Sequence, residues 1–162
     1  MTARLLLGAT CAFWAATAAS GDIAPEDIVW NGSSIAESLT GVPGDADEGF
    51  NVFSSRSIGN CVACHEIMSM PHIDWPGDVG PPLDGAAERW TEAELRGLVV
   101  DAKRTYEGSM MISFYKRSGY IRPGEAYTGR APEGGESGLS TLLTAQQVED
   151  VVAFLQTLTW DD

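Results

Sequence analysis

Two cysteines and a histidine lie close together in the middle of the chain, in the order Cys61-Val62-Ala63-Cys64-His65. Two thiols separated by two residues, with a histidine directly after the second, form the attachment pattern of c-type haem. In this interpretation the sulfurs of Cys61 and Cys64 each form a thioether with one vinyl group of the porphyrin. His65 then lies beneath the iron as its proximal ligand. The pattern therefore predicts one covalently bound haem c.

A Cys-x-x-Cys pair without the histidine also occurs in zinc sites and in thioredoxin-like redox centres. A structural zinc site needs four ligands, and the chain has no second Cys-x-x-Cys and no His-x-x-His pair. A redox pair would need a thioredoxin-like strand and helix around it. The haem interpretation is therefore favoured over both.

The second axial ligand of the iron is predicted in a later segment. In electron-transfer cytochromes this position is often a methionine thioether, which raises the reduction potential. Met110 and Met111 follow a predicted helix, lie after a Gly-Ser turn and precede two aromatic residues. Methionine is more often a filler of cores, so the context decides. Met111 is preferred, Met110 is the alternative and His72 is the third candidate, in a loop that also contains Met68 and Met70.

Pro81 is the candidate for a supporting role. A histidine that binds a metal normally donates its other ring N–H to an acceptor, which fixes the ring and tunes the metal. The backbone carbonyl of Pro81, which follows the haem motif in Gly80-Pro81, would be a rigid acceptor for His65. The alternative is an ordinary Gly-Pro turn.

Three helices are expected to position these residues. Three of residues 45–48 are acidic, which suits the positive N-terminal end of a first helix. Residues 49–53 of that helix combine a glycine with phenylalanines and allow another helix to cross closely. A T-x-x-E capping box at Thr91 begins a helix over about 91–104. A T-x-x-Q box at Thr144 begins the last helix, whose apolar stripe we expect to cross the first.

The N-terminus reads as a secretory leader. Residues 1–20 begin with a short positive segment, continue with an apolar run too short to span a bilayer and end in small residues. This pattern predicts a cleaved signal peptide. The protein is then expected in the periplasm, with no membrane span after cleavage. A retained anchor and a lipoprotein attached at Cys11 are the alternatives. Cleavage would leave only the two thiols of the haem motif. Residues 21–44 would form an extended N-terminal segment, and residues 45–160 the haem-binding domain.

The charge of the chain is strongly negative, at −13. Loss of the leader removes one Arg and no acid, so the remainder carries −14. Such a chain is a poor partner for nucleic acid or anionic membranes. The distribution is uneven, because residues 103–130 hold six of the nine remaining Lys and Arg against two acids, a local +4. This stretch overlaps a long loop at 117–140 and is either solvated loop charge or a docking face.

Several segments together resemble a class I cytochrome c domain, and more narrowly the SoxX family, the monohaem subunit of the SoxAX cytochrome of bacterial thiosulfate oxidation. They are the glycine and phenylalanine of the first helix, the run Gly59-Asn60 with the haem motif, the run Gly77-Asp78-Val79-Gly80-Pro81-Pro82-Leu83-Asp84-Gly85, Met110-Met111-x-x-Phe114-Tyr115 and residues 143–155. They cover most of 45–159. The resemblance implies an all-α class I cytochrome c fold, with crossing N- and C-terminal helices and long loops around one covalent haem.

The resemblance also implies roles for individual residues. Cys61 and Cys64 match the thioether anchors, and Pro81 matches the acceptor that orients the proximal histidine. His65 and Met111 match the axial ligands. The family often has Pro after the ligand methionine, whereas this chain has Ile112, which leaves Met110 open.

The function that the resemblance implies is electron transfer within a larger enzyme. SoxAX is an L-cysteine S-thiosulfotransferase that joins thiosulfate to a cysteine of the SoxYZ carrier. The catalytic cysteine is expected on the partner SoxA haem subunit, and this chain would pass the electrons to another cytochrome. A free-standing periplasmic electron carrier is the alternative, and a haem sensor or peroxidase with an exchangeable distal ligand is a third possibility.

Overall fold

The structure is a computed structural model that describes residues 21–120, 130–131 and 133–160. The predicted leader and part of the 117–140 loop lie outside these residues. The described part is all-α, as predicted, and its β-type backbone pairing is a single isolated bridge between Asn31 and Ser34. Its helices are η1 Pro25–Asp27, α1 Ala46–Ser54, η2 Cys61–Ala63, α2 Ala86–Arg89, α3 Glu92–Asp101, η3 Ala102–Arg104, η4 Gly135–Gly138 and α4 Ala145–Leu155. None of them is long and apolar enough to cross a membrane.

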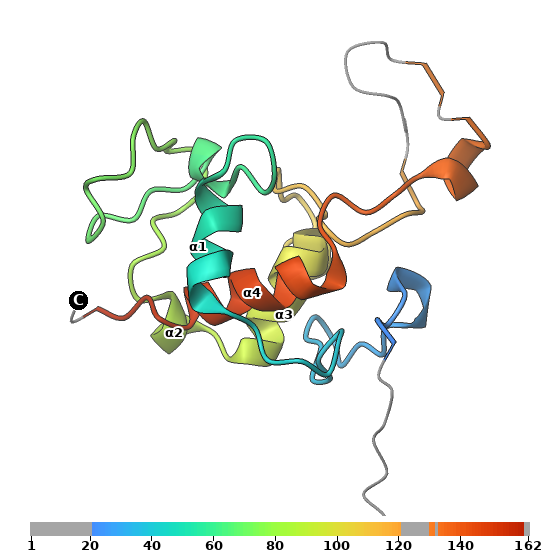
Figure 1. The fold of residues 1–162 in the computed structure, drawn as a ribbon, viewed down its shortest axis with the longest axis horizontal. Coiled ribbons are helices and arrows are strands. Elements are labelled where there is room, and N and C mark those ends of the chain that lie inside the picture. Colours follow the sequence, from blue (N-terminus) through green and yellow to red (C-terminus); the bar gives the residue numbers. More distant parts are fainter. Residues whose placement is uncertain (1–20, 121–129, 132, 161–162) are drawn as a thin grey trace, which may run out of the picture.

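The first and last helices cross, as the sequence predicts (Figure 1). Asp45 caps α1, because its carboxylate accepts hydrogen bonds from the backbone N–H groups of Asp47 and Glu48. Gly49 makes the crossing close: a Cβ at this position would lie only 1.9 Å from the carbonyl oxygen of Asp150 in α4. The backbones of α1 and α4 therefore touch, which only glycine allows here.

The capping boxes predicted at the other two helices are both present. Thr91 and Thr144 accept a hydrogen bond from the third helical residue, and that residue's side chain accepts one from the cap backbone. The predicted helix over 91–104 is real, but its last turn, η3, is a 3-10 helix. α3 packs against α4, so the three long helices enclose one core.

The core combines apolar side chains of all three long helices with others from the loops. The ring of Phe154 in α4 lies 5.4 Å from the rings of both Phe50 and Phe53 in α1, measured between centroids, in tilted geometry. Val62, within the haem motif, is buried in the same core. The haem motif is therefore fixed to the α1–α4 crossing by packing.

Residues 21–44 pack on the core, where Ile35 and Leu39 are fully buried. A buried ion pair holds them in place, with 2.9 Å between Nε of Arg96 in α3 and Oε1 of Glu149 in α4. Arg96 donates to the carbonyl of Ile35 at 2.8 Å, and Glu149 accepts from the N–H of Leu39 at 2.8 Å. The segment is thus tied to both helices by buried groups.

The cations of the basic stretch are engaged within the chain. Lys116 pairs with Asp101 at 3.1 Å, and Arg117 pairs with Glu26 of the N-terminal segment. Lys103 contacts the backbone carbonyl of Met111, and Arg104 lies over the ring of Trp30. Arg122 of this stretch lies outside the described residues. These contacts favour a structural role for this charge over a free docking face.

Candidate haem site

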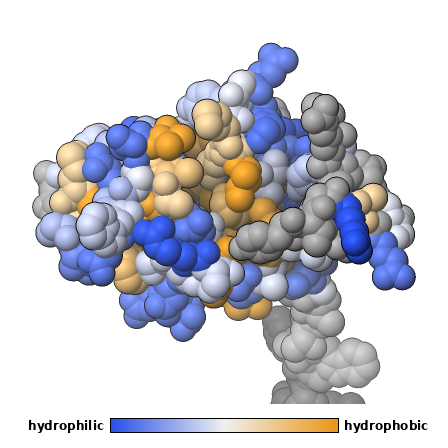
Figure 2. Space-filling view, turned by 90° about the horizontal axis from the view of Figure 1, so that it is seen from above, coloured by the Kyte–Doolittle hydropathy of each residue, from blue (hydrophilic) through white to orange (hydrophobic). Residues whose placement is uncertain are grey.

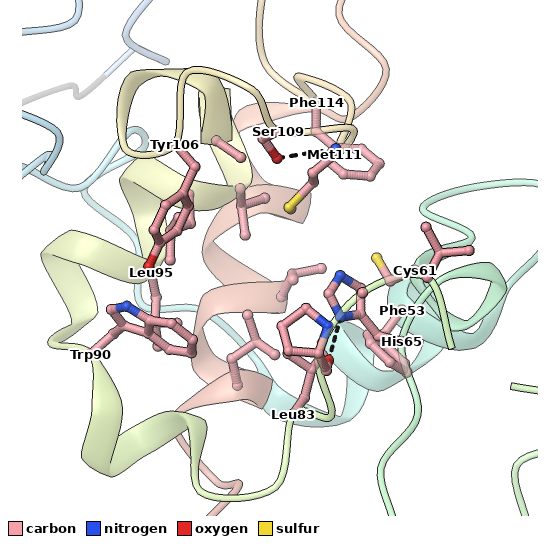
Figure 3. A pocket seen from close by; sticks show the side chains of 18 of the residues that line it. Phe53, Cys61, His65, Leu83, Trp90, Leu95, Tyr106, Ser109, Met111 and Phe114 are labelled. Carbon is pink, nitrogen blue, oxygen red and sulfur yellow. Dashed lines mark hydrogen bonds between the residues drawn. The ribbon is translucent and has the colours of Figure 1, made fainter. Parts of the chain in front are cut away.

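A deep apolar cavity opens between α3, α4 and the haem motif (Figure 3). It encloses about 1070 Å³, counting the part open to solvent, which is the size of a large cofactor site. The lining residues are Phe53, Cys61, His65, Val79, Gly80, Pro81, Leu83, Trp90, Leu95, Leu98, Val99, Ala102, Tyr106, Ser109, Met111, Phe114, Leu143, Val151 and Leu155. The walls are almost entirely hydrocarbon, so they suit a flat apolar ring system.

The haem motif forms one tight helical turn at the edge of this cavity. Asn60 precedes the turn in the left-handed conformation, with φ 51°. The N–H groups of Cys64 and His65 both donate to the carbonyl of Cys61 at 3.0 Å. Cys61 lines the cavity, and burial raises the pKa of its thiol to about 12. Cys64 lies on the outer side, in an adjoining cleft that also contains Cys61 and His65. One turn therefore brings both thiols and the imidazole to the adjoining cleft, and two of the three also line the main cavity.

The imidazole of His65 is oriented from behind by the segment Gly80-Pro81. Its Nδ1 lies 2.8 Å from the carbonyl oxygen of Pro81, the acceptor that the sequence predicts for it. The N–H of Gly80 donates to the carbonyl of Cys64 at 2.7 Å, which ties this segment to the motif. A Cβ on Gly80 would lie 2.3 Å from Cε1 of the ring. A side chain at position 80 would thus push His65 out of place.

Replacing Gly80 by alanine is accordingly expected to displace the imidazole and weaken its bond to Pro81. Overpacking of this kind costs about 1–3 kcal/mol, and we expect a fall in Tm together with a changed visible spectrum of the purified protein. Gly108→Ala is the matched control, because nothing lies within 4 Å of a Cβ there. Identical spectra and Tm values for the Gly80→Ala protein and the wild type would contradict this account of position 80.

Of the five candidates for a distal ligand, Met111 faces the main cavity. Figure 3 shows its sulfur directed into the space that His65 faces from another side. Its backbone is held on both sides, since its N–H donates to Oγ of Ser109 at 3.2 Å and its carbonyl accepts from Lys103. Met110 is 82% exposed and lines only the outer cleft.

The other three candidates lie away from the cavity. His72 is exposed and lines a separate hollow, with 6.2 Å between the centroids of its ring and that of Phe50. Met68 is exposed, and Met70 packs against the core without lining the cavity. The structure therefore brings Met111 together with Cys61 and His65.

Sequence reasoning missed a second support of the haem motif, the carboxylate of Asp84. It is buried and accepts hydrogen bonds from the N–H groups of Met68 and Ser69, both at 2.8 Å, so it fixes the start of the loop that follows His65. Burial by itself would raise the pKa of Asp84, but these hydrogen bonds outweigh it and lower the pKa. The available signal in the sequence was an acid near the end of the run 77–85. No pattern in the sequence indicated the contacts of Gly80, Ser109 and Lys103.

Replacing Asp84 by asparagine is expected to lower the free energy of unfolding at pH 7 by about 1.5–3 kcal/mol, the value of hydrogen bonds to a charged group. Because the pKa of Asp84 is lower in the folded state, its contribution is present above the unfolded pKa of about 3.9 and is lost as pH falls through the folded value. Urea unfolding of both proteins from pH 7 to pH 2 should therefore give a flatter acid limb for Asp84→Asn. Equal acid slopes would refute the role, and the exposed Asp78→Asn serves as control.

Comparison with known proteins agrees with this geometry. The family model of cytochrome c matches residues 46–159. A chain of the crystal structure of SoxXA from P. pantotrophus is 48% identical, with a TM-score of 0.79, and the match covers 85% of this chain and 98% of that chain. No curated protein matches the sequence significantly. The chain therefore belongs to the cytochrome c family, as a SoxX-type cytochrome whose cofactor is one covalently bound haem c.

Proposed function

We propose that this chain is the electron-transfer subunit of a SoxAX-type L-cysteine S-thiosulfotransferase in the periplasm. One observation carries the proposal: the cavity that gathers Cys61, His65 and Met111 belongs to a chain that matches nearly the whole length of a SoxXA chain. We further propose that residues 1–20 are a leader removed on export, which N-terminal sequencing of the purified protein would test.

In this proposal each residue of the cavity has a defined role. Cys61 and Cys64 would hold the porphyrin through thioethers, and His65 and Met111 would be the protein ligands of its iron. Bound haem supplies a one-electron redox centre, and a filled sixth position suits electron transfer rather than substrate binding. If Nδ1 of His65 donates to Pro81, Nε2 is left free to bind the metal, and the hydrogen bond makes the ring a stronger ligand.

The proposed reaction takes place on the partner. Thiosulfate and a carrier thiol on SoxYZ form one S–S bond, the thiol loses its proton, and two electrons leave. This chain accepts those electrons one at a time and passes them to another cytochrome. Beyond the predicted leader its cysteines are Cys61 and Cys64, both committed to haem in this proposal. The bond-forming cysteine is therefore assigned to the SoxA-like haem subunit.

Native purification from the periplasm of thiosulfate-grown cells is expected to yield two haem-stained bands on a denaturing gel, at a fixed ratio. The larger band would be the SoxA-like subunit. The same fraction should attach thiosulfate to the purified SoxYZ carrier when an electron acceptor is supplied. A single haem-stained band that elutes as a monomer would refute the complex and support the free-standing carrier instead.

A further inference from the structure

Trp75 is displayed on the surface in an unusual conformation. Its side chain is 87% exposed, and its backbone has φ 53°. Within the described part of the chain, only Asn60 is another non-glycine residue with positive φ. Asparagine tolerates this region, whereas for a bulky residue it is a true outlier that persists only when the surroundings enforce it. Such strain, combined with an exposed indole, calls for a functional reason.

The backbone of this loop is held by hydrogen bonds to Arg56 and to the haem motif. Arg56 donates to the carbonyls of Asp74 at 3.4 Å and of Trp75 at 3.1 Å. The N–H of Gly77 donates to the carbonyl of Val62 inside the haem motif at 2.8 Å. Among the contacts of described residues, no ring or cation packs on the indole of Trp75. The loop is therefore a fixed frame that presents a free indole.

The exposed charged side chains closest to Trp75 in the chain are acidic, and one cation, Arg56, contacts the backbone of its loop. Residues 57–88, which lie between Arg56 and Arg89, contain five acids and no Lys or Arg. Asp74 and Asp78, on either side of Trp75, are exposed, as is Val79. Figure 1 shows this loop at the upper left of the molecule, and Figure 2 shows the molecule from above, with apolar side chains gathered among polar ones. Charge complementarity therefore calls for a partner with a basic rim around an apolar socket.

We propose that Trp75 is the anchor by which this chain binds the haem-bearing partner subunit, in a socket rimmed by basic residues. This inference rests on the proposed function. A lasting partner is favoured over a transient electron acceptor, because tryptophan is a typical hot-spot residue and the hydrogen-bonded backbone of its loop needs little reordering on binding. Weak redox encounters instead use small interfaces. The hydrogen bond from the N–H of Gly77 to the carbonyl of Val62 ties the loop of Trp75 to the haem motif.

The test is a titration of the purified holo chain with the purified haem-bearing partner. Trp75→Asn removes the indole and keeps a residue that tolerates positive φ. We expect its Kd to rise at least about 30-fold, the loss typical of a hot spot. Its Tm should stay equal or rise, because backbone strain is relieved; a merely structural role would lower it. Trp160→Ala, which removes another exposed tryptophan (58%), is the control and should bind as the wild type does.

The two acids beside Trp75, Asp74 and Asp78, are tested separately by the rate of association. Neutralising Asp74 and Asp78 together with asparagine should slow association with the same partner by about tenfold at low salt and flatten its salt dependence, while the dissociation rate changes little. Unchanged association kinetics would refute the basic rim.

Three results would overturn the anchor. In the first, Trp75→Asn binds the haem partner as tightly as the wild type does, which would leave the proposed function intact. Loss of electron transfer to a downstream acceptor alone would mean that Trp75 serves a transient partner. A homodimer of the isolated chain that Trp75→Asn dissociates would mean that a second copy occupies the site. If the wild type itself does not bind the haem partner, the proposed function fails as well.

Discussion

Ferric protein carrying Met111→Ala is expected to lose the weak long-wavelength absorption band of a methionine–iron bond and to have a lower reduction potential. Met111 is the methionine that faces the cavity shared with His65. Its thioether favours the reduced iron, and axial ligands as a class move haem potentials over about 0.8 V. A shift on the order of 0.1 V or more is therefore expected. Absorption spectroscopy and a redox titration of the purified protein measure both effects.

Met110→Ala is the matched control, since it removes the same side chain one residue earlier, where it is exposed to solvent. It should keep the band and change the potential little. The reverse pattern, in which the band survives in Met111→Ala and disappears in Met110→Ala, would assign the ligand to Met110. Survival of the band in both proteins would mean that neither methionine alone is needed for it, whereas absence of the band from the wild type would favour an exchangeable distal side.

The sequence alone points to this candidate site because the parts of the site are local. A haem motif and two capping boxes are defined by residues within four positions of one another, so their chemistry is visible in the order of the chain. The choice between Met110 and Met111 was not decidable in this way. Adjacent residues in a turn point in different directions, and only the path of residues 106–114 over the cavity shows which sulfur faces inward.

The tertiary supports of the fold were invisible in the sequence. Arg96 lies in a predicted helix whose pattern marks it as a surface residue, and residues 21–44 have a composition typical of a loop. Their burial depends on Glu149, which lies 53 positions along the chain from Arg96. A charged residue is placed in a core only by a partner that neutralises it, and no short pattern reveals a partner at that distance.

Replacing Glu149 by alanine is expected to lower the free energy of unfolding by about 3–5 kcal/mol, the typical result of removing one partner of a buried ion pair. The guanidinium of Arg96 is only 2% exposed and would lose a carboxylate that it contacts through both Nε and Nη2. The backbone N–H of Leu39 would also lose its acceptor. We expect residues 21–44 to become the first part of the chain to open, as cleavage by a protease near Leu39 would report.

Glu92→Gln is the control that shows whether the loss in Glu149→Ala depends on the burial of the carboxylate or only on its charge. Glu92 also contacts Arg96, but it is 61% exposed, so its replacement should cost less than about 1 kcal/mol. Urea unfolding of the holo protein, analysed by linear extrapolation, compares the two variants directly. Equal losses for Glu92→Gln and Glu149→Ala would mean that the buried pair contributes no more than a surface contact does. A large loss confined to Glu149→Ala would show that the N-terminal segment is an integral part of the cytochrome, because its attachment and the stability of the α3–α4 core would then depend on the same carboxylate.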